Sequence, residues 1–153
     1  MEAQAPGLLA MAHLVVLALW GGVVATEAVV EVLPFRRPEL HPAAIRFHTW
    51  IDLLVELPLV LAVVGTGAAL ALTVEPLTTT HLVKIGFAGA AVAVNLFCIA
   101  VVLRRGRRLD RSGGDDAPLW RGSRIVLACF AAGLACAAVA ATLGFRLALE
   151  HLG

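Results

Sequence analysis

Four long apolar runs constrain the fold of this chain more than any other feature of its sequence. Hydrophobic residues make up 60% of the 153 residues and charged residues only 15%, a balance far from that of a water-soluble domain. About 20 consecutive apolar residues let a helix cross the hydrocarbon core of a bilayer. We therefore predict an all-α integral membrane four-helix bundle, a single transmembrane domain over residues 1–153. Its predicted spans are 8–33, 43–72, 80–103 and 123–149.

Positive residues gather at two of the three connections between these runs. Arg36, Arg37 and Arg46 lie at the first connection and seven arginines lie at the third, whereas the N-terminal tail and the second connection carry no Lys or Arg. Because positive loops are retained on the cytoplasmic side, we expect both basic connections in the cytoplasm and both termini outside. We expect a bacterial inner membrane location, with the lipid bilayer as partner and no nucleic acid.

The cysteines and the N-terminus add two smaller expectations. Cys98, Cys129 and Cys136 fall within apolar runs and form no Cys-x-x-Cys pair, so we interpret them as small core residues. The first apolar run has no basic region before it and no convincing cleavage site. We therefore expect it to be the first span and not a removed signal peptide.

Ionisable residues recur at helical spacing inside the first two spans. His48, Asp52 and Glu56 are four residues apart, which keeps them near one face of the second span. Glu27 and Glu31 share a face of the first span in the same way. Each group loses water inside a bilayer and needs a partner, a metal ion or a proton. The short connection makes the two spans antiparallel neighbours, and a rise of about 1.5 Å per residue places the two groups at overlapping depths.

Carboxylates that converge with a histidine favour a metal centre. Closely spaced carboxylates in a low-dielectric site cannot all stay ionised unless cations compensate them. Inward-facing carboxylates and histidines are also the ligands of di-metal sites in helix bundles. We therefore predict a divalent transition metal site, iron or zinc with one or two ions, between the first two spans. The predicted ligands are Glu27, Glu31, His48, Asp52 and Glu56, with Asn95 or Lys84 as supporting groups.

The sequence leaves the use of this site open. A redox-active ion would suit oxidation of a lipid-soluble substrate, and zinc would suit hydrolysis by an activated water. A metal or proton transporter that uses the deep acids Asp52 and Glu56 is the non-enzymatic alternative. In a further alternative, the acids are protonated, or they form a structural polar network with Arg36, Arg37 and Arg46 of the first connection.

A smaller polar group lies toward the opposite ends of the spans. His13 lies in the first span, and His81 and Lys84 open the third, all within roughly 8 Å of the outer surface by helical rise. A histidine here can bind haem or copper, with Lys84 holding a propionate or a substrate anion. Taken individually, each residue is more typical of a membrane interface, where amphipathic side chains reach the headgroups.

Part of this pattern resembles a known family. His13, Trp20 and Gly21-Gly22 in the first span, with His81-Leu-Val-Lys84 opening the third, are similar to the pattern of the HemJ-type protoporphyrinogen oxidases and related small four-span haem membrane proteins. In that family a first-helix His and a third-helix Lys are the functional residues, and the proteins bind haem. The resemblance implies His13 as an axial ligand and Lys84 as its partner, in a haem-binding membrane oxidoreductase.

Overall fold

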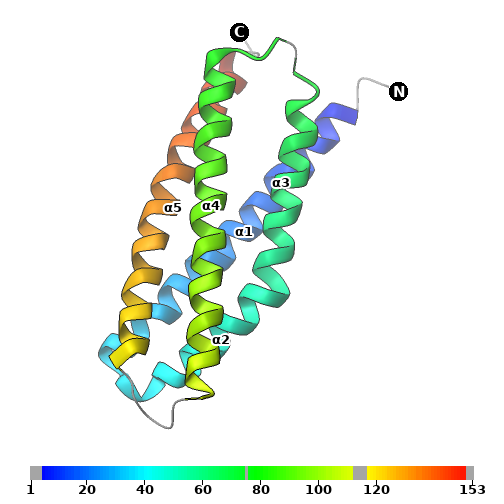
Figure 1. Cartoon of the computed structure of the whole chain (residues 1–153). Coiled ribbons are helices and arrows are strands. Elements are labelled where there is room, and N and C mark those ends of the chain that lie inside the picture. The colour runs from blue at the N-terminus through cyan, green and yellow to red at the C-terminus, as the bar shows by residue number, and fades with distance from the viewer. Residues whose placement is uncertain (1–4, 75, 112–116, 151–153) are drawn as a thin grey trace. The chain divides into compact units, whose positions relative to one another are not determined.

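The computed structural model describes residues 5–74, 76–111 and 117–150, which form helices and short connections (Figure 1). No strand occurs in these ranges, so the predicted all-α fold class is confirmed. In chain order the elements are α1 (Ala5–Arg36), η2 (Pro38–Leu40), α2 (His41–Ile51), η3 (Asp52–Glu56), α3 (Leu57–Ala71), α4 (Thr79–Leu109) and α5 (Ala117–Glu150).

Four helical stretches are long and apolar enough to cross a membrane. They cover Gly7–Arg36, Pro38–Ala71, Thr79–Leu109 and Leu119–Leu147. The first of these stretches continues beyond residue 33, where the sequence predicted its end, because Pro34 is accommodated in the last turn of α1. A proline at that place removes one hydrogen bond without breaking a long run of helix after it.

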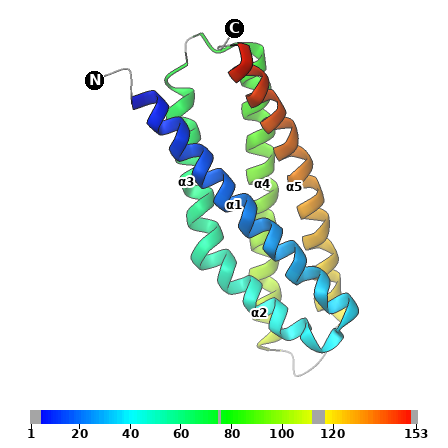
Figure 2. The ribbon, with the colours of Figure 1, turned by 180° about the vertical axis from the view of Figure 1, so that it is seen from behind.

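The chain divides into two compact units, Met1–Glu75 and Pro76–Gly153, which we call unit 1 and unit 2. In unit 1, α1 packs against an antiparallel arm made of α2, η3 and α3, and η2 forms the tight turn between them (Figures 1 and 2). In unit 2, α4 and α5 pack along each other as an antiparallel hairpin (Figure 2). Each unit therefore buries one long helix-to-helix contact.

The second membrane-spanning stretch is not a uniform α-helix. Residues 52–56 form a π-helical turn, in which the N–H of Leu57 donates to the carbonyl of Asp52, five residues back. Side chains spaced by four positions drift by about 40° per step around an α-helix. The wider π turn reduces this drift, and His48, Asp52 and Glu56 are all buried on the side that faces α1. Pro58, two residues after Glu56, has no N–H for a regular α-helical bond at this point.

The helices of unit 2 share an apolar core. The core of the hairpin contains Cys98, Val102 and Val126, with Cys129 and Phe130 packed against it. The cysteines of the chain are free thiols, and two of them thus occupy the core positions expected for small apolar residues.

A glycine also accommodates the one buried arginine of this hairpin. A Cβ at Gly122 would lie 2.9 Å from Cδ of Arg105, so the absence of a side chain there lets Arg105 lie across α5. Its Nη1 then donates to Oγ of Ser123 at 2.9 Å. Arg105 and Ser123 are both buried, and their contact joins the two helices of unit 2.

Candidate metal site

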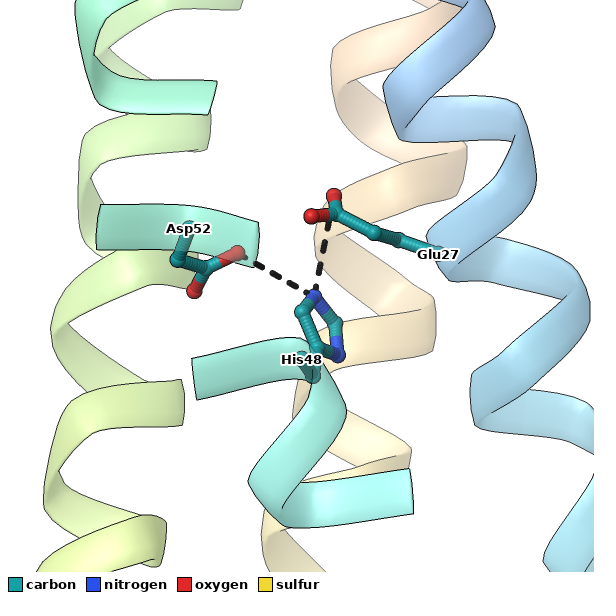
Figure 3. A group of neighbouring side chains, drawn as sticks. All are labelled: Glu27, His48 and Asp52. Atoms are coloured by element: carbon teal, nitrogen blue, oxygen red, sulfur yellow. Dashed lines mark ion pairs between the residues drawn. The ribbon is translucent and has the colours of Figure 1, made fainter. Parts of the chain in front are cut away.

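His48 is the centre of the polar cluster in unit 1. Its Nδ1 lies 2.9 Å from Oε2 of Glu31, and its Nε2 lies 3.4 Å from Oδ1 of Asp52 and 3.7 Å from Oε2 of Glu27. Figure 3 shows Glu27 reaching from α1 toward His48, and Asp52 reaching toward the same ring nitrogen. One imidazole therefore contacts three carboxylates that come from two helices.

Two pairs of residues at four-residue spacing produce this geometry. Glu27 and Glu31 lie on successive turns of α1, and His48 and Asp52 lie on successive turns of the α2–η3 arm. Because residues four apart lie on one helix face, each helix presents two polar groups to the other. The tight turn at η2 sets the register at which the two pairs meet.

All members of the cluster are removed from solvent. The exposed fraction is 0% for Glu27 and 1% for Glu31, His48 and Asp52. Neither carboxylate oxygen of Glu27 has a hydrogen-bond donor among the described residues, although its Oε2 faces the imidazole at 3.7 Å. A buried carboxylate without hydrogen bonds is costly, so Glu27 is the residue whose burial most requires an explanation.

The cluster has the composition and size of a metal-binding group. Glu27, His48 and Asp52 each offer one ligand atom, and these three atoms all lie within 4.8 Å of one another. Imidazole nitrogen with carboxylate oxygen is a donor set used for zinc and for iron. The arrangement can therefore accept one divalent cation between α1 and the α2–η3 arm.

Glu56 lies one helical turn beyond this cluster. We call the resulting row of buried polar residues the seam of unit 1, and it contains Glu27, Glu31, His48, Asp52 and Glu56. The Oε1 atom of Glu56 accepts a hydrogen bond of 3.2 Å from Nε1 of Trp20, and Glu56 is buried. The π turn brings Glu56 to the side of η3 that faces α1. Of the five predicted ligands, Glu27, Glu31 and Asp52 are thus gathered around the imidazole of His48, whereas Glu56 is hydrogen-bonded to Trp20.

Arginines do not neutralise these acids within unit 1. Arg36, Arg37 and Arg46 are exposed, and none of the ion pairs found among the described residues joins one of them to a carboxylate of the cluster. The alternative in which these arginines pair with the acids therefore receives no support from the contacts of unit 1.

The remaining predicted residues have other surroundings. Nδ1 of His13 lies 2.8 Å from Oγ1 of Thr66 on α3, and its ring packs against Gly67. Asn95 and Lys84 belong to unit 2, where Asn95 is buried and Lys84 packs against Gly144 of α5.

His81 takes part in starting a helix. Thr78 is the N-cap of α4, and the Nδ1 of His81 accepts from the backbone N–H of Thr78 at 3.4 Å and lies 2.7 Å from its hydroxyl. This reciprocal contact resembles a capping box, which satisfies N–H groups left without partners at the start of a helix. His81 therefore has a local structural role.

Two features of the site were not predicted from the sequence. The first is the hydrogen bond from Trp20 to Glu56, and the second is the π turn of η3. A partial signal for the first exists, because Trp20 precedes Glu27 by seven residues and so lies on the same face of α1. For the second, the signal is Pro58 two residues after a buried acid.

Comparison with known proteins leaves this geometry as the main basis for function. No protein-family model matches the sequence, and neither the search of curated proteins nor the search of solved structures gave a match.

Proposed function

We propose that this integral membrane protein binds a divalent transition metal ion, iron or zinc, through Glu27, His48 and Asp52. The observation that carries the proposal is the state of Glu27, which is 0% exposed and has no hydrogen-bond donor to either carboxylate oxygen among the described residues. A cation between Glu27, Asp52 and His48 would satisfy this carboxylate. It would also explain why ligand atoms from two helices converge within 4.8 Å.

Charge balance supports a divalent ion. Two ionised carboxylates and a neutral imidazole around a 2+ ion give a neutral group, which costs less to bury than separate charges. The mixture of one nitrogen and two oxygen donors suits borderline ions better than Ca²⁺ or Mg²⁺, which prefer all-oxygen sites. Three protein ligands also leave coordination positions for water or substrate, as in catalytic sites.

The other two predicted ligands surround this centre. Glu31 is hydrogen-bonded to His48, and Glu56 is hydrogen-bonded to Trp20. With these two carboxylates the seam contains four acids, enough charge for the second ion of a dinuclear site. The cluster of Glu27, His48 and Asp52 supports one ion, and a dinuclear site with a second ion is an extension of the same proposal.

The reaction class follows from the ion. Iron would supply redox chemistry toward a lipid-soluble substrate, and zinc would supply a Lewis acid for hydrolysis. In either case the residues of the chain bind the ion, and the burial of Glu27, His48 and Asp52 excludes bulk water from it. A transporter that carries a metal ion or a proton through the same seam is the non-enzymatic alternative.

A haem-binding oxidoreductase that uses His13 and Lys84 is the second candidate. The hydroxyl of Thr66 donates to the carbonyl of Ala62 at 2.7 Å, so its oxygen accepts from Nδ1–H of His13 at 2.8 Å. With the proton on Nδ1, the lone pair of a neutral His13 would lie on Nε2, the atom that would bind haem iron. Lys84, its proposed partner, lies in unit 2.

The test is the metal content and visible spectrum of the protein purified in detergent. The proposal expects about one iron or zinc ion per chain and no Soret band. The metal content should fall to background in Glu27→Ala and in Asp52→Ala. His13→Ala and the exposed control Glu39→Ala should retain the metal. A Soret band that disappears in His13→Ala would favour haem instead, and a folded protein without metal would overturn both assignments.

A further inference from the structure

We propose that Glu31 positions His48 for metal binding and is not itself a ligand of the ion. This inference rests on the proposed metal site and assigns a different role to one of its acids. Glu31 would hold the proton of the imidazole on Nδ1 and thereby leave the lone pair of Nε2 directed at the ion.

The distances separate the two edges of the imidazole ring. Nδ1 makes one short contact, 2.9 Å to Oε2 of Glu31, which is within the range of a charge-assisted hydrogen bond. Nε2 faces Asp52 at 3.4 Å and Glu27 at 3.7 Å, distances that exceed those of good hydrogen bonds. The short contact and the two longer contacts therefore have different chemical roles.

The chemistry of the acceptor decides where the proton of a neutral imidazole lies. An ionised carboxylate can only accept, so a hydrogen bond to Glu31 requires the hydrogen to be on Nδ1. In the opposite tautomer, the lone pair of Nδ1 would face the oxygen of Glu31 at 2.9 Å, which is repulsive. The favoured tautomer leaves Nε2 as the metal-binding atom, on the edge of the ring that faces Glu27 and Asp52.

The position of Glu31 in the fold fits this role. It lies one turn after Glu27 on α1, so the same helix supplies a ligand and the group that orients the opposing ligand. Its bonded oxygen lies on the far edge of the ring from Nε2. Metal-binding histidines generally donate their second ring N–H to such a carboxylate, and loss of that carboxylate typically weakens metal binding by about 10- to 100-fold.

The first experiment compares zinc affinity in detergent by competition with a chelator. Glu31→Ala should bind one zinc per chain about 10- to 100-fold more weakly than wild type. Glu31→Gln, whose amide oxygen can still accept from Nδ1–H, should recover most of that loss. Glu39→Ala is the matched control, because Glu39 is an exposed glutamate of the neighbouring turn η2.

The second experiment reads the tautomer directly. In zinc-loaded protein labelled with ¹⁵N-histidine, His48 should show a metal-bound Nε2 and a hydrogen on Nδ1, with the signals assigned from a His48→Gln sample. The exchange of this Nδ1 hydrogen with water should be faster in Glu31→Ala than in wild type. A change in fold alone would not move this signal selectively.

The outcomes distinguish this inference from the proposed function. Absence of zinc binding to wild type would overturn the metal site itself. Zinc binding that Glu31→Ala does not weaken, or a metal-bound Nδ1, would overturn only the positioning role. Complete loss of zinc in both Glu31→Ala and Glu31→Gln, equal to that in Glu27→Ala, would show that Glu31 is a ligand.

Discussion

The two units of the chain use buried polar residues in different ways. Unit 2 joins its two helices with a buried arginine whose Nη1 donates to Ser123, and Gly122 provides the space for the arginine side chain. Unit 1 joins its helices with carboxylates gathered around one imidazole, and one of these, Glu27, has no hydrogen-bond donor among the described residues. Both units are antiparallel helical arrangements of apolar sequence, so the contrast lies in the chemistry of their contacts.

This contrast bears on the proposed metal site of unit 1. An arginine that reaches a hydroxyl on the facing helix gains a charge-assisted hydrogen bond within the protein. Carboxylates around a single imidazole carry more negative charge than that imidazole can compensate. We infer that the polar contact of unit 2 stabilises the hairpin, whereas the cluster of unit 1 is arranged for a cation.

The largest expected effect is the loss of metal from His48→Ala. His48 contacts Glu27, Glu31 and Asp52, so its removal deletes a proposed ligand and the contact that holds the three acids together. The loss of zinc affinity should exceed the about 100-fold limit typical of a supporting residue. Ser123→Ala, which removes the polar partner in unit 2, should keep about one zinc per chain in the same assay.

The next effect is the stabilisation of the protein by the proposed metal ion. A ligand that binds only the folded state at 100 times its Kd raises the free energy of unfolding by about 2.7 kcal/mol. Zinc should therefore raise the midpoint of thermal unfolding in detergent for wild type and for Ser123→Ala. Zinc should leave the unfolding midpoint of Glu27→Gln unchanged. An equal rise of the midpoint in Glu27→Gln would mean that zinc binds elsewhere.

The sequence predicts the helices and the faces of the polar residues well. Apolar length and composition are enough to identify four spanning helices, and the four-residue spacing of Glu27 with Glu31 and of His48 with Asp52 fixes their faces. The connection at η2 is short, which makes α1 and α2 antiparallel neighbours. These local rules account for the convergence of the cluster.

The sequence predicts the partner of each acid poorly. Which oxygen meets which donor depends on the register between α1 and the α2–η3–α3 arm, and the π turn of η3 changes that register. Spacing alone does not distinguish Glu27, Glu31 and Glu56. In the structure Glu31 contacts His48 and Glu56 accepts a hydrogen bond from Trp20. Glu27 has no hydrogen-bond donor among the described residues. Such differences arise from packing between helices and have no signal in the pattern of either helix.

A smaller effect should appear in unit 2 on filling the space beside Arg105. In Gly122→Ala the new Cβ would lie 2.9 Å from Cδ of Arg105, so the arginine must move and its bond to Ser123 is strained. We expect a loss of about 2 kcal/mol in the free energy of unfolding, as is typical of overpacking. Unfolding in a denaturing detergent would measure it.

Gly133→Ala is the control for this effect. The nearest atom to its new Cβ is Cγ1 of Val94 at 3.8 Å, an ordinary contact. Because alanine favours a helix over glycine by up to about 1 kcal/mol, this variant should be neutral or slightly more stable. Equal destabilisation by both variants would contradict the structural role assigned to Arg105 and Gly122, and neither variant should change the metal content.

The smallest effect tests where the proposed metal site ends along the seam of unit 1. Trp20→Phe keeps an aromatic ring but removes the N–H that donates to Oε1 of Glu56 at 3.2 Å, so we expect a loss of about 1 kcal/mol in stability. Trp50→Phe, at an exposed position of α2, should have no measurable effect. If Glu56 lies outside the metal site, Trp20→Phe will bind zinc with wild-type stoichiometry and nearly unchanged affinity. A large loss of zinc instead would mean that Glu56 is a ligand held in place by Trp20, which would extend the site along η3 and favour the dinuclear arrangement.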